Sequence, residues 1–175
     1  MEELYIELED KEWPLESISH DRTIVRAVLF DDEGYFYFVQ ADRDDLFGKA
    51  KHIETVGGGV EEGEDLNEAL RRELDEELGA KVEVITKIGV VSDYYNVIHR
   101  HNLTNYYLCK ALSFGDKHLT EDEKNSFHLS TVKFTYEDAI NKYESCANTS
   151  IGRLIRNREL PILKRAHEIM NLSLS

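Results

Sequence analysis

The sequence predicts an α+β or mixed α/β sandwich, and three observations support this prediction. Strand-like and helix-like segments follow one another without the regular βαβ order of a parallel sheet. The chain has 175 residues, 41% hydrophobic and 32% charged, which suffices for one hydrophobic core. No internal repeat, low-complexity tract or linker rich in Pro, Gly and Ser divides it. We therefore expect a single domain over residues 1–175.

The first part of the chain predicts an extension followed by a β-hairpin. The N-terminal extension, residues 1–21, is acidic and carries a strand-like stretch at 4–8. Residues 23–30 are rich in β-branched and apolar side chains and predict a strand. A turn signal at 31–34 precedes the expected returning strand at 35–40.

The remainder of the chain predicts a glycine loop, a helix, further strands and a helical end. The glycine loop comprises Gly57, Gly58 and Gly59, and an acidic helix is expected at 65–78. Apolar residues recur at helical spacing over 160–171, within a C-terminal helical segment at 148–175. The other expected elements are strands at 82–91, 104–111 and 132–135 and a helix at 136–145.

Charge and composition limit the classes of partner. The 35 Asp and Glu residues outnumber the 21 Lys and Arg residues, giving a formal net charge of −14. Such a surface repels DNA and RNA, so no nucleic-acid polymer is expected, whereas bound cations still permit a small phosphorylated substrate. No apolar run approaches the roughly 20 residues that span a membrane, and no signal peptide is evident. Only Cys109 and Cys146 are present, which favours the cytoplasm. The sequence is compatible with a homodimer but does not fix the oligomeric state.

The helix at 65–78 has clear end signals and an apolar stripe. Asp65 and Glu68 have the spacing of a capping box, and Gly79 fits a left-handed stop. Leucine recurs at every fourth position and gives the helix a face to bury.

Three carboxylates share another face of this helix. At about 100° per residue, Glu76 and Glu77 project within about 60° on either side of Glu73. Like charges at this spacing, in a last turn where the helix dipole disfavours anions, oppose helix stability. An oxygen-ligated cation such as Mg²⁺ would remove the conflict. A solvated acidic face is the alternative interpretation of the helix taken alone.

The stretch from Gly58 to Ala80 closely resembles the Nudix box, so the chain is similar to Nudix hydrolases. Ala80 is the one departure, since the family pattern has a bulky apolar residue at this packing position. The resemblance implies a mixed sheet between helices and water-driven cleavage of a diphosphate linkage in a small nucleotide-like substrate. The matching positions are Gly58, Glu64, Arg72, Glu73, Leu74, Glu76, Glu77 and Gly79.

The resemblance also implies a division of roles among the box residues. Glu73, Glu76 and Glu77 are expected to bind Mg²⁺ (or Mn²⁺), with Glu64 as a further metal ligand or a support for the loop. Such a cation can polarise the diphosphate and activate water. Glu73 or Glu77 is also a candidate base, and Arg72 is expected to orient the carboxylates through ion pairs.

Further site residues are expected outside the helix. The glycines at 57–59 would let the backbone approach the substrate closely, although a plain turn explains them too. Nudix enzymes often use an additional acid beyond the box, which makes Glu121 or Glu123 a candidate base. Arg100, which lies between two histidines, or His101 is a candidate phosphate contact, while a zinc site there lacks two further ligands. Tyr95 is a candidate for stacking on a base, with burial in a strand as the alternative.

Two other functions fit the resemblance less well. A Nudix-fold module that senses a nucleotide without hydrolysing it often lacks one or more box carboxylates, whereas this chain keeps them all. Isopentenyl diphosphate isomerase relies on a cysteine ahead of the box, and no cysteine precedes Cys109. A missing proline beyond the box argues weakly against ADP-ribose as substrate. The sequence leaves the substrate itself open.

Overall fold

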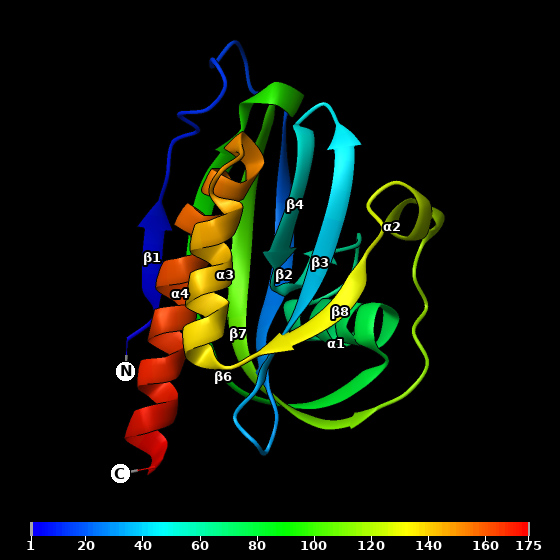
Figure 1. Ribbon diagram of the computed structural model, residues 1–175, viewed down its shortest axis with the longest axis vertical. Helices are drawn as coiled ribbons and strands as arrows, with labels where there is room; N and C mark the ends of the chain where they lie inside the picture. Colours follow the sequence, from blue (N-terminus) through cyan, green and yellow to red (C-terminus); the bar gives the residue numbers. More distant parts are fainter. Residues whose placement is uncertain (1, 175) are drawn as a thin grey trace.

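Eight strands form one sheet around β2 in the computed structural model (Figure 1). The order is β1-β6-β7-β2-β3-β4, with β5 also pairing with β2 and β8 with β3. The structure describes residues 2–174, so the two ends of the predicted domain, Met1 and Ser175, lie outside the described residues. The strands are β1 (Leu4–Glu7), β2 (His20–Phe30), β3 (Phe36–Asp45), β4 (Gly48–Glu54), β5 (Val56–Gly59), β6 (Ala80–Tyr95), β7 (Arg100–Phe114) and β8 (Ser130–Phe134).

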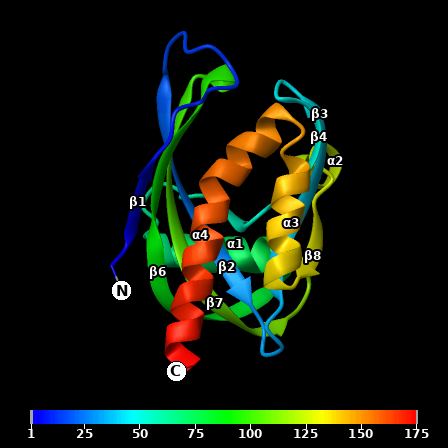
Figure 2. The ribbon, with the colours of Figure 1, turned by 60° about the vertical axis from the view of Figure 1, so that its left-hand side comes forward.

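Helices cover both sides of this sheet. Figure 2 shows β6 and β7 on one side and β3, β4 and β8 on the other, with α3 and α4 across the front and α1 behind. One core cluster packs beneath α3 and α4 and includes Phe38, Tyr106 and Leu163, while a second beneath α1 includes Val25 and Leu74. The prediction of a mixed sheet between helices is confirmed. The helices are α1 (Leu66–Leu78), α2 (Glu121–Asn125), α3 (Tyr136–Cys146) and α4 (Ser150–Leu174), with a 3₁₀ turn η1 (Asn96–Ile98).

The sheet divides at β2, and this division makes room for a cavity. β2 runs parallel to β7 along its whole length, from His20 opposite Arg100 to Phe30 opposite Lys110. β2 and β3, in contrast, pair only near the turn that joins them, at Leu29 opposite Tyr37. The rest of β3, with β4, therefore diverges from β2.

The expected elements are present, but α2 and η1 were not predicted, β6 and β7 extend beyond the expected 82–91 and 104–111, and three further differences are informative. The prediction of a glycine loop is wrong, because Gly57, Gly58 and Gly59 belong to β5 and pair with β2. Glycines have no side chains whose alternation could indicate a strand. β4 was not predicted because its buried face carries Ala50 and His52 rather than an apolar run. The last helix begins at Ser150, within the predicted helical segment at 148–175, and so starts before the apolar spacing of 160–171, which charged residues interrupt further upstream. No helix among the described residues is long and apolar enough to span a membrane.

Candidate active site

Helix α1 is held at both ends as the sequence predicts. The Asp65 side chain accepts from the Glu68 backbone N–H at 2.8 Å, and the Glu68 carboxylate accepts from the Asp65 N–H at 3.2 Å. Gly79 ends the helix with φ of 62°. Leu70 and Leu74 are fully buried against the sheet. This fixes the neighbouring, acidic face of the helix toward the cavity.

Two of the three carboxylates on this face of α1 are buried, which is unusual for acidic side chains. Glu73 is 8% exposed and Glu77 is 5% exposed, whereas Glu76 is about one-third exposed. Burial raises the pKa of Glu73, and the nearby charges of Glu76 and Glu123 raise it further against the opposing effect of Arg72. The acidic face is therefore not a solvated surface.

Glu77 is the most deeply buried of these acids. Its Oε2 atom is buried and has no hydrogen-bond partner. Desolvation raises the pKa of Glu77 well above its usual value, Arg26 lowers it, and the charges of Glu73 and Glu123 raise it again. A buried, unsatisfied carboxylate oxygen is expensive to maintain, so it calls for a ligand that the protein itself does not supply.

Arg72 organises the remaining carboxylates. Its guanidinium donates to both oxygens of Glu64, at 2.7 and 2.9 Å, and to the carbonyl of Gly59 at 3.0 Å. One further nitrogen contacts Glu73 at 2.9 Å and Glu76 at 3.3 Å. This bidentate pairing lowers the pKa of Glu64 to about 2. Across residues 2–174, no three His, Cys, Asp or Glu side chains are already grouped so as to hold a metal ion.

The glycines of β5 are required by close contacts. A Cβ on Gly58 would lie 2.6 Å from the Glu73 carboxylate carbon, and one on Gly57 would lie 2.1 Å from the Val25 carbonyl oxygen. A Cβ on Gly59 would lie 2.8 Å from the guanidinium of Arg22. The Val25 carbonyl is backbone, so a side chain at Gly57 would displace β5 from β2, whereas a side chain at Gly58 would push the Glu73 carboxylate out of its position.

A cavity of about 750 Å³ lies where β2 and β3 diverge, next to the acids of α1 and the glycines of β5. The acids of α1 and the glycines of β5 line it together with side chains from β2, β3, β4 and β7. His52 is 1% exposed there, neither ring nitrogen has a protein partner, and burial lowers its pKa. The lining residues that sequence reasoning missed are Arg22, Arg26, Arg43, His52, Glu54 and Arg158.

The structure distinguishes the two acids proposed on the later loop. Glu123 lines the cavity and lies close enough to Glu77 to raise its pKa. Its carboxylate also accepts from the Thr120 backbone N–H at 2.9 Å in the capping box of α2. Glu121 is not among the residues that line the cavity, and its carboxylate accepts from Asn125 at 2.7 Å.

Tyr95 and Arg100 both lie at the cavity, as expected for substrate contacts. Tyr95 is 8% exposed, and its hydroxyl accepts from Arg158 at 2.6 Å, so the ring is held within the protein. The Arg100 guanidinium lies 5.3 Å from the centre of that ring. His101 instead contacts Ser92 at 2.6 Å, on the side away from this cavity.

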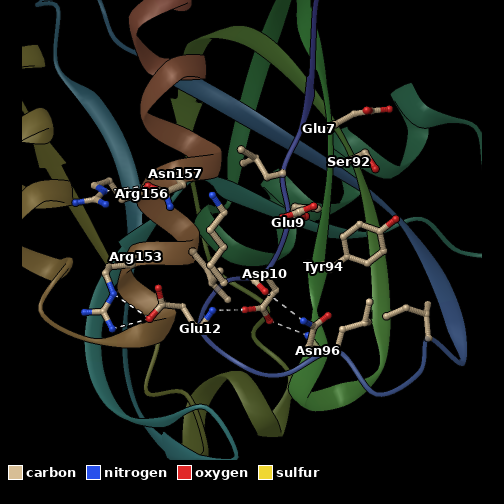
Figure 3. A pocket seen from close by; sticks show the side chains of 16 residues that line it. Glu7, Glu9, Asp10, Glu12, Ser92, Tyr94, Asn96, Arg153, Arg156 and Asn157 are labelled. Carbon is tan, nitrogen blue, oxygen red and sulfur yellow. Dashed lines mark hydrogen bonds and ion pairs between the residues drawn. The ribbon is translucent and has the colours of Figure 1, made fainter.

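A second, larger cavity of about 1080 Å³ lies under the N-terminal segment (Figure 3). Its polar groups largely serve to hold that segment in place. Asp10 accepts from the backbone N–H of Asn96 at 2.8 Å, and Arg153 of α4 donates to Glu12 at 2.6 Å. The box acids and glycines lie outside this cavity, so we place the chemistry in the smaller one.

Comparisons with known proteins agree with this geometry. The model of the NUDIX domain family matches residues 20–150 of the chain. Over 67 residues the chain is 43% identical to the nucleoside triphosphatase NudI of Escherichia coli K12, covering 38% of this chain and 45% of that protein. The match thus spans less than half the length of these curated relatives.

Solved structures with low sequence identity share the fold. A NUDIX hydrolase from Nitrosomonas europaea has a TM-score of 0.65 at 19% identity, over 84% of this chain and 88% of that one. The MutT protein from Methanosarcina mazei Go1 has a TM-score of 0.61 at 14% identity, over 89% and 97% of the two chains.

Proposed function

Because the chain belongs to the Nudix hydrolase family, we propose that it hydrolyses a diphosphate linkage in a small nucleotide substrate. Nudix enzymes act on small nucleotide substrates and generally use divalent metal ions. Similarity to the nucleoside triphosphatase NudI supports a nucleoside-diphosphate-type substrate. The free, buried cysteines Cys109 and Cys146 support a cytoplasmic location.

The observation that carries this proposal is the unsatisfied oxygen of Glu77 at the floor of the cavity. Glu77 and Glu73 are buried beside one another, and burial with like charge raises the pKa of both. A helix that served only to support the fold would not bury two acids in this way. The arrangement suits a cation-binding face that opens on a substrate cavity.

Carboxylate oxygens are the ligands that Mg²⁺ prefers, so the residues present fit a divalent cation of this kind. Glu73, Glu76 and Glu77 would hold it, with Glu64 kept in its pair with Arg72. When bound, the cation would neutralise charge on the diphosphate and acidify the attacking water. We favour Mg²⁺, with Mn²⁺ as a substitute. Arg72 would have to loosen its contacts with Glu73 and Glu76, because it engages both.

The protein's own residues then divide the remaining work. Arg72 keeps Glu64 and the carbonyl of Gly59 in place, and Gly58 lets β5 pass close to Glu73. Glu123, which reaches the cavity from the α2 segment, is a candidate to take the proton from water, as are Glu73 and Glu77. Each is an acid in the same cavity, so single variants are needed to assign the base.

Phosphate release with Mg²⁺, and separately with Mn²⁺, tests this function. The panel should cover nucleoside triphosphates, dinucleoside polyphosphates, nucleotide sugars, ADP-ribose, NADH and coenzyme A. We expect metal-dependent turnover of one class, lost in Glu77→Gln and kept in the exposed control Glu83→Gln. Unchanged turnover in Glu77→Gln would contradict the proposal. Tight binding of a panel member without turnover would favour the silent sensing module instead.

A further inference from the structure

Six arginines line the cavity, and four of them have a carboxylate partner. Arg26 and Arg158 share Glu54, at 2.8 and 2.5 Å. The other two paired arginines are Arg43 with Asp45 and Arg72 with Glu64. The remaining two are Arg22 and Arg100. Within residues 2–174, neither has a carboxylate oxygen within 4.0 Å. In a chain with a formal charge of −14, acids are plentiful, so two unpaired arginines in one cavity are unexpected.

Arg100 is half-buried and fixed in place. Its Nε donates to Asn102 at 2.7 Å, and its guanidinium lies against Tyr95. Burial, together with the neighbouring charge of Arg22, lowers the pKa of Arg100 to about 10. Asn102 and Tyr95 are neutral, so this surrounding orients the guanidinium without cancelling its charge.

Arg22 lies at the exposed rim of the same cavity. The absence of a side chain on Gly59 makes room for its guanidinium, since a Cβ there would lie 2.8 and 2.9 Å from two of its nitrogens. Partial burial lowers the pKa of Arg22, and so does the neighbouring charge of Arg26. Glu73 and Glu54 oppose this lowering from a distance, but neither forms an ion pair with Arg22, so the protein accommodates this cation closely without a carboxylate in direct contact.

The strand register brings these two arginines together. On the parallel strands β2 and β7, Arg100 lies opposite His20 and Asn102 lies opposite Arg22. Side chains two residues apart point to the same face of a sheet, so Arg22 and Arg100 project side by side into the cavity. Each guanidinium group loses hydration there because it is partly buried, and the two like charges repel each other. An anion bound between them would relieve both unfavourable effects.

We infer that Arg22 and Arg100 bind a phosphate group of the substrate that is additional to the diphosphate linkage being cleaved. This inference rests on the proposed function and names the substrate class for the same cavity. Paired guanidinium groups match the oxygens of a phosphate through several charge-assisted hydrogen bonds. The acids of α1 lie on the opposite side of the β5 glycines, where Gly58 meets Glu73 and Gly59 meets Arg22. The added phosphate therefore binds beside, and apart from, the carboxylate face.

Matched substrates test this inference. Coenzyme A and dephospho-coenzyme A differ only by a phosphomonoester, and each nucleoside triphosphate differs from its diphosphate only by a terminal phosphate. In Arg22→Gln and Arg100→Gln, KM for the substrate with the added phosphate should rise about tenfold to a hundredfold, the loss of a charge-assisted contact. KM for its partner and kcat for both should stay unchanged. The pair that responds identifies the source of the phosphate, and Arg22→Lys should restore part of the loss.

A binding measurement separates failure of the inference from failure of the proposed hydrolysis. Titration of inorganic pyrophosphate into the metal-free protein, followed by calorimetry in EDTA, needs no turnover. Wild type and Arg71→Gln should bind alike, because Arg71 is an exposed arginine outside the cavity that also lacks a carboxylate partner. Arg22→Gln and Arg100→Gln should bind about tenfold or more weakly. Equal binding by all four proteins, no binding by wild type, or equal KM changes for both members of each pair would overturn the inference.

Discussion

Replacement of Glu159 by alanine should unfold the protein far more readily than most single substitutions. Glu159 of α4 is fully buried and accepts four hydrogen bonds. Thr55 donates its backbone N–H at 2.7 Å and its hydroxyl at 2.5 Å. The hydroxyls of Tyr106 and Tyr143 donate at 2.8 and 2.9 Å. Glu159→Ala removes every one of these acceptors at once.

The expected loss follows from the number of donors left buried. A buried donor without an acceptor destabilises the folded state by about 1–3 kcal/mol, so four donors give a loss of at least about 4 kcal/mol. The space left by the side chain adds to this loss. The free energy of unfolding of a domain is commonly about 5–15 kcal/mol, so this loss is a large fraction of the stability of the protein. With a urea m-value of about 2 kcal/mol per M, the midpoint should fall by about 2 M.

Urea unfolding followed by far-UV circular dichroism measures this loss, and two further variants calibrate it. Tyr143→Phe removes one donor, and the loss should be about 2 kcal/mol, as for one hydrogen bond to a charged group. Glu159→Gln keeps the shape and lets the Thr55 and Tyr106 hydroxyls accept instead of donate, so its loss should lie between those of the other two. A loss below about 1 kcal/mol in Glu159→Ala would refute the reasoning, because it would fall under the penalty for even one unsatisfied donor.

Three further predictions concern the cavity. Arg26 and Arg158 offset the desolvation of Glu54 and lower its pKa to about 2, so its stabilising effect should be complete above the ordinary value of 4.5 and be lost progressively as the pH falls from there through 2. Carboxyl ¹³C NMR should therefore find Glu54 still ionised at pH 3.5, and titration near 4.5 would contradict the pairing. Gly58→Ala should lower kcat/KM at least about tenfold, because the added Cβ meets the Glu73 carboxylate at 2.6 Å, and a crystal structure of the variant should show that carboxylate displaced. EDTA should abolish turnover and added Mg²⁺ or Mn²⁺ should restore it, whereas activity that survives chelation would rule out a metal-dependent reaction.

The sequence predicted the elements whose signals are local. The capping box at Asp65, the leucine stripe and the left-handed Gly79 all act within one helix, and α1 has the expected bounds. The burial of Glu73 and Glu77 also follows from their place next to that stripe. Most strands were found because their β-branched and apolar residues face a core.

Other parts of the site depend on pairing between distant segments. Arg22 stands near the start of a strand and has no motif, and its relation to Arg100 appears only once β2 and β7 are aligned. His52 lies on β4, where lysines and the histidine itself replace the apolar residues whose alternation with polar ones would indicate a strand. Arg158 and Glu159 look like ordinary surface charges of a helix, yet both are buried. Nothing local in the sequence distinguishes a buried ionic network from a solvated one.

Arg158 and Glu159 show how the C-terminal helix α4 supports the geometry of the Nudix box. Arg158 forms an ion pair with Glu54, and Glu159 accepts hydrogen bonds from Thr55. Helix α4 therefore holds two consecutive residues at the junction of β4 and β5 in place. β5 begins at the next residue, and its glycines set the spacing between the sheet and Glu73. The carboxylate face of α1 therefore depends on α4, which contributes no residue to the box. Loss of the contacts of Arg158 and Glu159 with Glu54 and Thr55 should therefore weaken catalysis even where α1 itself stays helical.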